Sequence, residues 1–170
     1  MTLALYAGSF DPFTKGHQYV VDQTLKRHDN LIILIAVNPG KKYMFTDEER
    51  RQMILDCLPA DLSGRGKNVE VVILPSGKLV IDYARARRVT DMIRGMRSPS
   101  DFVEEQGLFT FNESIYPSVL HWFVMPPYEL GNTSSTWVKY YWMGEDWETK
   151  LPQLVPPPVF ERLKEKKNEQ

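Results

Sequence analysis

The chain has 170 residues and a mass of 19.8 kDa, enough for one domain with a real hydrophobic core. Hydrophobic residues make up 42% and charged residues 25% of it, which excludes disorder as the main state. With 21 basic and 22 acidic residues the formal net charge is -1, so no overall positive field exists to hold a nucleic acid.

Short apolar runs and polar helical segments alternate along the chain. The aliphatic run 31–37 is typical of a central strand in a parallel sheet, because both faces of such a strand are buried. A capping box at Thr46–Glu49 predicts a helix start. In chain order, the expected strands are 2–7, 31–37, 69–74, 90–93 and 120–125, and the expected helices are 16–26, 47–58, 79–88, 100–112, 133–143 and 160–167, the last after a proline turn at 155–159.

This alternation predicts an α/β fold, a Rossmann-like, doubly wound, five-stranded parallel sheet with a C-terminal helical extension, in a single domain of residues 1–170. Ligands bind such sheets at the carboxyl ends of the strands. We therefore expect the functional residues in the segments 8–12, 38–42, 75–77, 94–97 and 125–127.

Several classes of protein are disfavoured by what the sequence lacks. The longest apolar run is too short to cross a bilayer, and the first residues lack the pattern of a secretory signal. We expect a cytoplasmic protein without a membrane or nucleic-acid partner. The single Cys57 excludes an internal disulfide framework and a cysteine-rich metal site, and no metal-ligating residues are expected.

The turn after the first expected strand, GSFDPFTKGH at 8–17, has the richest chemistry. It is neither a Walker A loop nor a G-x-G-x-x-G loop. Gly16 and His17 open the next helix, whose free N–H groups and dipole favour an anion, and an imidazole there can donate to a phosphate oxygen. A purely structural strand–helix turn is the alternative interpretation.

This turn resembles the (T/H)-x-G-H signature of the nucleotidyltransferase superfamily, in the S/T-F-D-P-x-T-x-G-H form of the phosphopantetheine adenylyltransferase family. Each further motif alone is unspecific, but the ordered set is specific and spans nearly the whole chain. The set is N-P-G-K-K at 38–42, F-T-D-E-E-R at 45–50, I-R-G-M-R at 93–97, S-D-F-V-E-E at 100–105, M-P at 125–126, T-S-S-T at 133–136 and L-V-P-P at 154–157.

The resemblance implies an enzyme of coenzyme A biosynthesis that transfers AMP from ATP to 4′-phosphopantetheine and releases pyrophosphate. It implies direct in-line attack without a covalent intermediate, so that catalysis depends on positioning and charge. It also implies Mg²⁺ that travels with ATP, held mostly by phosphate oxygens and water, and a homohexamer.

The resemblance also assigns roles to residues. It implies that His17 stabilises the transition state, that Lys41 and Arg94 complete the catalytic set by holding phosphopantetheine, that Ser9 contacts both substrates, and that Val80 lines the pantetheine channel. The implied contacts with ATP come from Ser9, Phe10, His17, Gly95, Met96, Arg97, Glu105, Leu130, Gly131, Asn132, Thr133, Ser134, Ser135 and Thr136.

Without the resemblance, plainer interpretations stay open. Arg94 and Arg97 are compatible with surface charges, Lys41 with a polar turn, and Glu105 with a surface helix position. We expect His28 to be solvated. The segments 106–115 and 128–132 depart from the family pattern, which leaves the adenine contacts open.

Two other functions also remain. One is a sister nucleotidyltransferase that acts on nicotinamide mononucleotide or uses CTP, and the S-F-D-P form with Lys41 and Arg94 argues against it. The other is a catalytically silent regulator that binds a nucleotide or coenzyme A. The intact set of Ser9, His17, Lys41 and Arg94 argues against this second alternative.

Overall fold

A computed structural model describes residues 2–38 and 40–169, except for the side chains of Ser100 and Glu104. Five parallel strands form one sheet in the order β3-β2-β1-β4-β5. Pro39 of the N-P-G-K-K motif lies outside the described residues. The strands are β1 (Leu3–Gly8), β2 (Asn30–Ile35), β3 (Asn68–Ile73), β4 (Asp91–Gly95) and β5 (Leu120–Val124).

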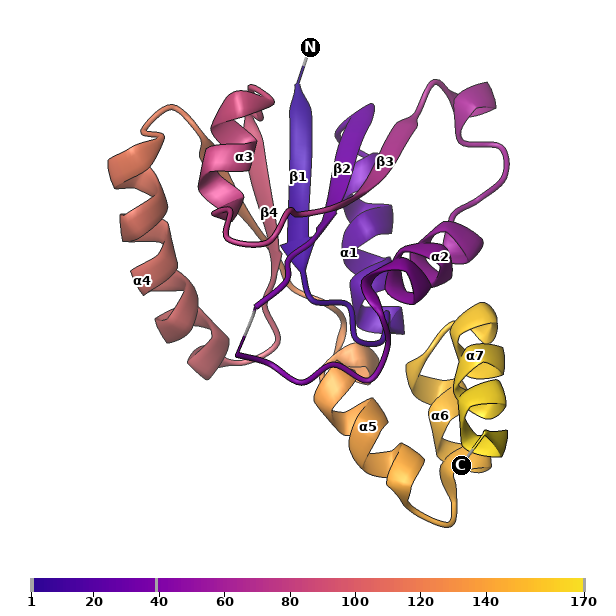
Figure 1. Ribbon diagram of the computed structural model, residues 1–170. Helices are drawn as coiled ribbons and strands as arrows, with labels where there is room; N and C mark the ends of the chain where they lie inside the picture. The colour runs from indigo at the N-terminus through magenta and orange to yellow at the C-terminus, as the bar shows by residue number, and fades with distance from the viewer. Residues whose placement is uncertain (1, 39, 170) are drawn as a thin grey trace.

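Helices cover both faces of this sheet, so the predicted doubly wound α/β fold is confirmed. Figure 1 shows α1 and α2 on one side of the strands, α3 and α4 on the other, and α5 to α7 beyond the carboxyl end of β1. The helices are α1 (Lys15–Leu25), α2 (Asp47–Cys57), α3 (Val80–Ala86), α4 (Pro99–Ile115), α5 (Ser135–Met143), α6 (Trp147–Leu154) and α7 (Pro157–Asn168), with short 3₁₀ turns at Ser63–Arg65 and Tyr128–Leu130.

Alternation along the central strands divides the core between the two faces. Tyr6 of β1 and Ile33 of β2 pack with residues of α1, α2 and the C-terminal helices. Leu5 of β1 and Ile32 of β2 pack with residues of α3 on the opposite face. Because both faces are covered, residues 31–35 of the predicted aliphatic run are all buried in β2, and the strand ends before residues 36 and 37. This rigid sheet fixes the strand ends that carry the functional segments.

The C-terminal helices differ from expectation. Helix α6 was not expected, since Pro152 is typical of a helix end, yet it lies inside α6 next to the buried Leu151. Helix α7 begins at Pro157, in the part of the chain expected to be a turn, because proline is tolerated in the first turn of a helix. No helix in the described part of the chain is long and apolar enough to span a membrane.

Candidate active site

Two cavities lie at the carboxyl ends of the strands, one on each side of the end of β1. The first cavity has a volume of about 230 Å³ and is lined by the start of α1, the end of β4 and the start of α4. The second has a volume of about 410 Å³ and is lined by the segments that follow β2 and β3 and by α4. Both cavities are lined by Ala7, Gly8 and Arg94, so these residues form the wall between them.

His17 lines the first cavity from the first turn of α1. The Thr14 hydroxyl accepts a hydrogen bond from the His17 backbone N–H at 3.3 Å, and His17 Nδ1 accepts one from the Thr14 backbone N–H at 3.0 Å. Because a backbone N–H can only donate, Nδ1 is unprotonated and the proton lies on Nε2. These two reciprocal hydrogen bonds form a capping box at the start of α1. The capping box therefore fixes the tautomer of the imidazole.

The charge state of His17 follows from its surroundings. Burial, together with the positive charge of Arg97, lowers the pKa of His17 from 6.5 to about 3. Rings of Phe10 and Phe13 flank the imidazole, with centroids 5.1 and 5.6 Å away. His17 is thus a neutral, rigidly held hydrogen-bond donor.

The end of β1 bends sharply toward this histidine. Phe10 has a φ of 48°, and its buried ring lies under Gly8. A Cβ on Gly8 would lie 2.9 Å from that ring, so only glycine fits there. The bend leaves Ser9 lining the second cavity and Phe10 lining the first.

Arg94 connects the two cavities from the end of β4. Its Nε donates to Glu105 Oε2 at 2.8 Å, its Nη2 pairs with Glu105 Oε1, and its Nη1 donates to the Ala7 carbonyl at 2.9 Å. Glu105, an expected ATP contact, lines the first cavity, and both of its carboxylate oxygens are engaged by Arg94. This pairing was not anticipated from the sequence.

The other residues expected around ATP are only partly gathered. Gly95, Arg97 and Thr133 line the first cavity, and the Arg97 backbone N–H donates to Asp101 at 2.7 Å. Ser135 lies close by, because its hydroxyl donates to the Pro12 carbonyl at 2.9 Å. The expected residues that do not line that cavity are Ser9, Met96, Leu130, Gly131, Asn132, Ser134, Ser135 and Thr136.

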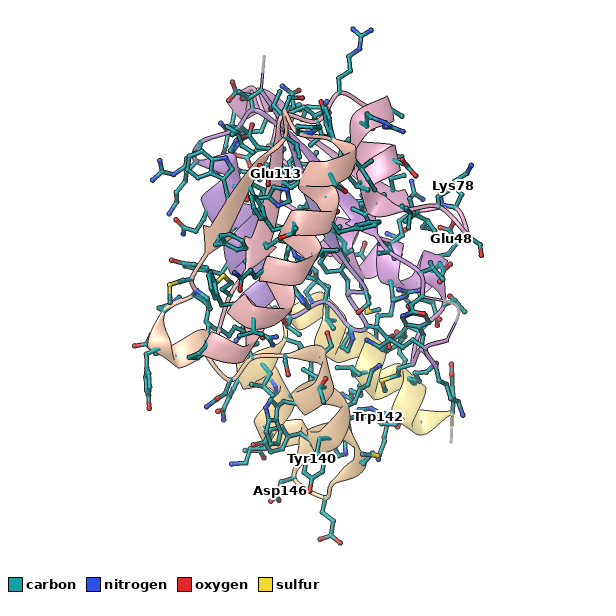
Figure 2. All side chains as sticks on the ribbon, turned by 90° about the vertical axis from the view of Figure 1, so that its left-hand side faces the viewer. Glu48, Lys78, Glu113, Tyr140, Trp142 and Asp146 are labelled. Atoms are coloured by element: carbon teal, nitrogen blue, oxygen red, sulfur yellow. The ribbon has the colours of Figure 1, made fainter. Side chains whose placement is uncertain are left out.

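The second cavity is lined by both positively charged and apolar side chains. Lys41, Lys78 and Arg94 line it, and the described lining residues include no Asp or Glu. Lys78 follows the turn after β3 and was not predicted, and Figure 2 shows its side chain projecting at the edge of the molecule. The apolar lining includes Val80, the residue expected along the pantetheine stem, and Phe111 of α4. An anionic compound with an apolar stem fits these surroundings.

Sequence reasoning missed two buried charged residues that brace the site. Asp11 accepts hydrogen bonds from the backbone N–H groups of Met44 and Phe45, each at 2.9 Å, and pairs with Lys139 of α5. Arg50 of α2 donates to the Ser9 carbonyl at 2.7 Å. Both residues stood within the quoted F-D-P and E-E-R motifs, which gave the only signal for them.

One histidine is placed differently from expectation. His28 is buried rather than solvated, with its Nδ1 3.3 Å from the Thr24 carbonyl and its Nε2 3.5 Å from Asp91. The prediction relied on the charged neighbours of His28 in the sequence, whereas the tertiary contact with β4 decides its burial. It lies outside both cavities.

Comparison with known proteins agrees with this geometry. The cytidylyltransferase-like family profile matches residues 5–150. A nicotinic acid mononucleotide adenylyltransferase of Plasmodium falciparum, solved in complex with APC, matches the fold with a TM-score of 0.66 at 15% identity, over 96% of this chain and 94% of that one. Thermotoga maritima TmcAL bound with alpha-thio ATP matches with a TM-score of 0.62 at 16% identity, over 99% and 56%. The profile match places the chain in the cytidylyltransferase-like family, and these solved structures share its fold.

Curated relatives narrow this class. A phosphopantetheine adenylyltransferase of Neisseria meningitidis serogroup C (strain 053442) is 34% identical over 160 residues, which are 94% of this chain and 91% of that protein. One of Geobacter sulfurreducens is 36% identical over 164 residues, 96% and 94% of the two chains. The chain belongs to the phosphopantetheine adenylyltransferase family, and the resemblance seen in its motifs is confirmed.

Proposed function

We propose that this enzyme transfers AMP from ATP to 4′-phosphopantetheine, giving dephospho-coenzyme A and pyrophosphate. The observation that carries the proposal is the pair of cavities that meet at Arg94, one holding the neutral donor His17 and the other lined by Lys41 and Lys78. ATP would occupy the first cavity and phosphopantetheine the second, with its phosphate toward Ser9 and Arg94 and its stem along Val80.

In the reaction, a phosphate oxygen of phosphopantetheine attacks the α-phosphorus of ATP as the bond to the pyrophosphate oxygen breaks. The attacking phosphate is already an anion, so no base has to remove a proton. His17 Nε2–H donates to the α-phosphate, where negative charge grows in the transition state. Lys41 and Arg94 hold the attacking phosphate in line.

Mg²⁺ would reach the site with ATP and neutralise charge on its phosphates. The carboxylates that line the first cavity, Asp101 and Glu105, are engaged by Arg97 and Arg94. In the described part of the chain, no cluster of three or more His, Cys, Asp or Glu side chains could hold a metal by itself. The ion would therefore be bound mostly by phosphate oxygens and water.

We carry the cytoplasmic location and the homohexamer over from the family resemblance as part of this proposal. The edge strand β5 supports self-association, because Leu120, Trp122 and Phe123 are exposed on it and Met125 is exposed directly after it.

A parallel assay tests the substrate. The purified protein is given ATP and Mg²⁺ with 4′-phosphopantetheine, nicotinamide mononucleotide or glycerol 3-phosphate, and pyrophosphate release is followed; a further arm replaces ATP by CTP. We expect release only with ATP and 4′-phosphopantetheine. Release with another acceptor or with CTP alone would select a sister nucleotidyltransferase, and no release in any arm would favour a silent binding protein.

A further inference from the structure

The ion pair between Arg94 and Glu105 lies where the two substrates have to meet. Arg94 lines both cavities, whereas Glu105 lines only the first. The side chains are largely buried, with 27% and 14% of their surfaces exposed. A bidentate carboxylate–guanidinium pair of this kind holds the planar side chain in one orientation.

The hydrogen bonds of Arg94 leave part of its guanidinium available. The group has five N–H bonds. Glu105 accepts hydrogen bonds from the single N–H of Nε and from one N–H of Nη2. The Ala7 carbonyl accepts one from an N–H of Nη1. No other described residue accepts a hydrogen bond from this group, so one N–H remains on each terminal nitrogen.

The environment of Glu105 disfavours contact with the phosphates of ATP. Both carboxylate oxygens already accept hydrogen bonds from Arg94. A second negative charge next to a triphosphate would repel it, and the guanidinium offsets that charge only while the pair stays intact.

We propose that Glu105 is a positioning residue that fixes Arg94 in the wall between the two cavities, so that its two remaining N–H groups bridge the attacking phosphate and the α-phosphate of ATP. This inference rests on the proposed function. It gives Glu105 a different role from the direct ATP contact implied by the family resemblance. Held in this way, Arg94 loses little side-chain freedom when the substrates bind.

A double-mutant cycle tests the inference through steady-state kinetics with each substrate varied in turn. Glu105→Gln should raise KM for 4′-phosphopantetheine and lower kcat, together reducing kcat/KM about 10- to 100-fold, the effect expected when a charged hydrogen-bond partner is lost. KM for ATP should change less than KM for 4′-phosphopantetheine. In an Arg94→Ala background the same substitution should change kcat/KM less than about twofold, because the two residues act as one unit.

Glu113→Gln is the matched control, because Glu113 is exposed on the same helix, as Figure 2 shows, and lines neither cavity. If Glu105→Gln does not fold, Glu105→Asp keeps the charge but draws the carboxylate back from Arg94, and the same kinetic pattern is expected.

Two results would overturn the inference. One is a loss that is undiminished in the Arg94→Ala background, and the other is a loss confined to KM for ATP, which would make Glu105 a direct ATP ligand. If the wild type releases no pyrophosphate, the proposed function fails instead. The positioning role is then tested by calorimetric measurement of 4′-phosphopantetheine binding. Glu105→Gln should weaken this binding when Arg94 is present and should not weaken it further in the Arg94→Ala background.

Discussion

His17 shows how one backbone contact sets the chemistry of a side chain. The Thr14 N–H occupies Nδ1, and so the N–H of the other ring nitrogen, Nε2, is left for a substrate. His17→Ala should lower kcat on the order of 100- to 1,000-fold, as for loss of one preorganised donor. We expect a smaller change in the Kd for ATP, measured by calorimetry.

His17→Gln is the matched comparison for that variant. Glutamine at this position can accept from the Thr14 N–H, as in an ordinary capping box, and it still carries an N–H donor. It should keep the melting temperature of the wild type and recover part of the rate. Near wild-type kinetics in His17→Ala would refute the catalytic role.

The lowered pKa of His17 also links this residue to acid stability. The folded pKa of about 3 lies below the ordinary 6.5, so folding favours the neutral ring. Its contribution to stability is present above pH 6.5 and is lost as the pH falls toward 3. Between pH 7 and 4.5, the free energy of unfolding should therefore fall more steeply in the wild type than in His17→Gln, as measured by urea unfolding.

Nitrogen NMR gives an independent reading of the same property. The His17 ring, assigned by its absence in His17→Gln, should show the Nε2–H tautomer and no titration above pH 4.5. A titration midpoint near 6.5 would contradict the burial of the neutral ring.

Among the elements, the loops around β1 depend on one buried carboxylate. Asp11 connects the turn after β1 to the loop before α2 and to α5. Asp11→Asn removes the charge that pairs with Lys139 and presents an amide to the N–H donors of that loop. We expect a loss of about 3 kcal/mol in the free energy of unfolding, as for a broken buried pair.

The same variant should raise KM for 4′-phosphopantetheine, because Lys41 lies in the loop that Asp11 holds. Asp56→Asn, at an exposed position of α2, should change neither quantity. Equal stability of the two variants would show that Asp11 does not brace the site.

Two helical glycines have different surroundings, so substitution by alanine should have opposite effects at the two positions. A Cβ on Gly16 would lie 3.1 Å from the Thr133 carbonyl, so Gly16→Ala should push the start of α5 away from α1 and raise KM for ATP. Gly107 of α4 has nothing within 4 Å of such a Cβ, and Gly107→Ala should stabilise the protein by up to about 1 kcal/mol through helix propensity. Thermal unfolding and kinetics of both variants test the pair, and a stabilised Gly16→Ala would refute the close contact.

The elements show what the sequence can predict. Strand β2 and the start of α2 were predictable because the aliphatic run and the Thr46 capping box are local signals, and the structure confirms both. Helix α6 was not, because its local signal is Pro152 while packing of Leu151 decides the outcome. Tertiary packing overrides local preference there.

The candidate site also combines features that the sequence predicts with features that it does not. The order of elements put Lys41 and Arg94 in segments at the strand ends and His17 at the start of the next helix, and the structure places all three in the two adjoining cavities. The pairing of Arg94 with Glu105 depends on how α4 lies against β4. The bonds from Asp11 to the loop before α2 join residues more than 30 positions apart. No local pattern encodes contacts of that kind.

At the scale of the whole molecule, exposed apolar residues on and after β5 and on α5 line neither cavity of the candidate site. Leu120, the first residue of the edge strand β5, and Met125, which directly follows the strand, are 59% and 71% exposed. Figure 2 shows a second exposed position, Tyr140 of α5, at the end of the molecule near Asp146. The exposed residues at β5 and those of α5 can be tested separately as contacts between subunits, because they belong to different elements.

If β5 carries the contacts between subunits, light scattering after size exclusion should give about six times the 19.8 kDa of one chain. Leu120→Glu should then reduce the assembly to smaller species, because a charge cannot be buried unpaired in an apolar contact. Met143→Glu, at an exposed apolar position of α5, is the matched control and should leave the mass unchanged. A wild type that elutes as a single chain, or a Leu120→Glu variant of unchanged mass, would exclude β5 as the assembly surface, while loss of the assembly in Met143→Glu alone would move that surface to α5.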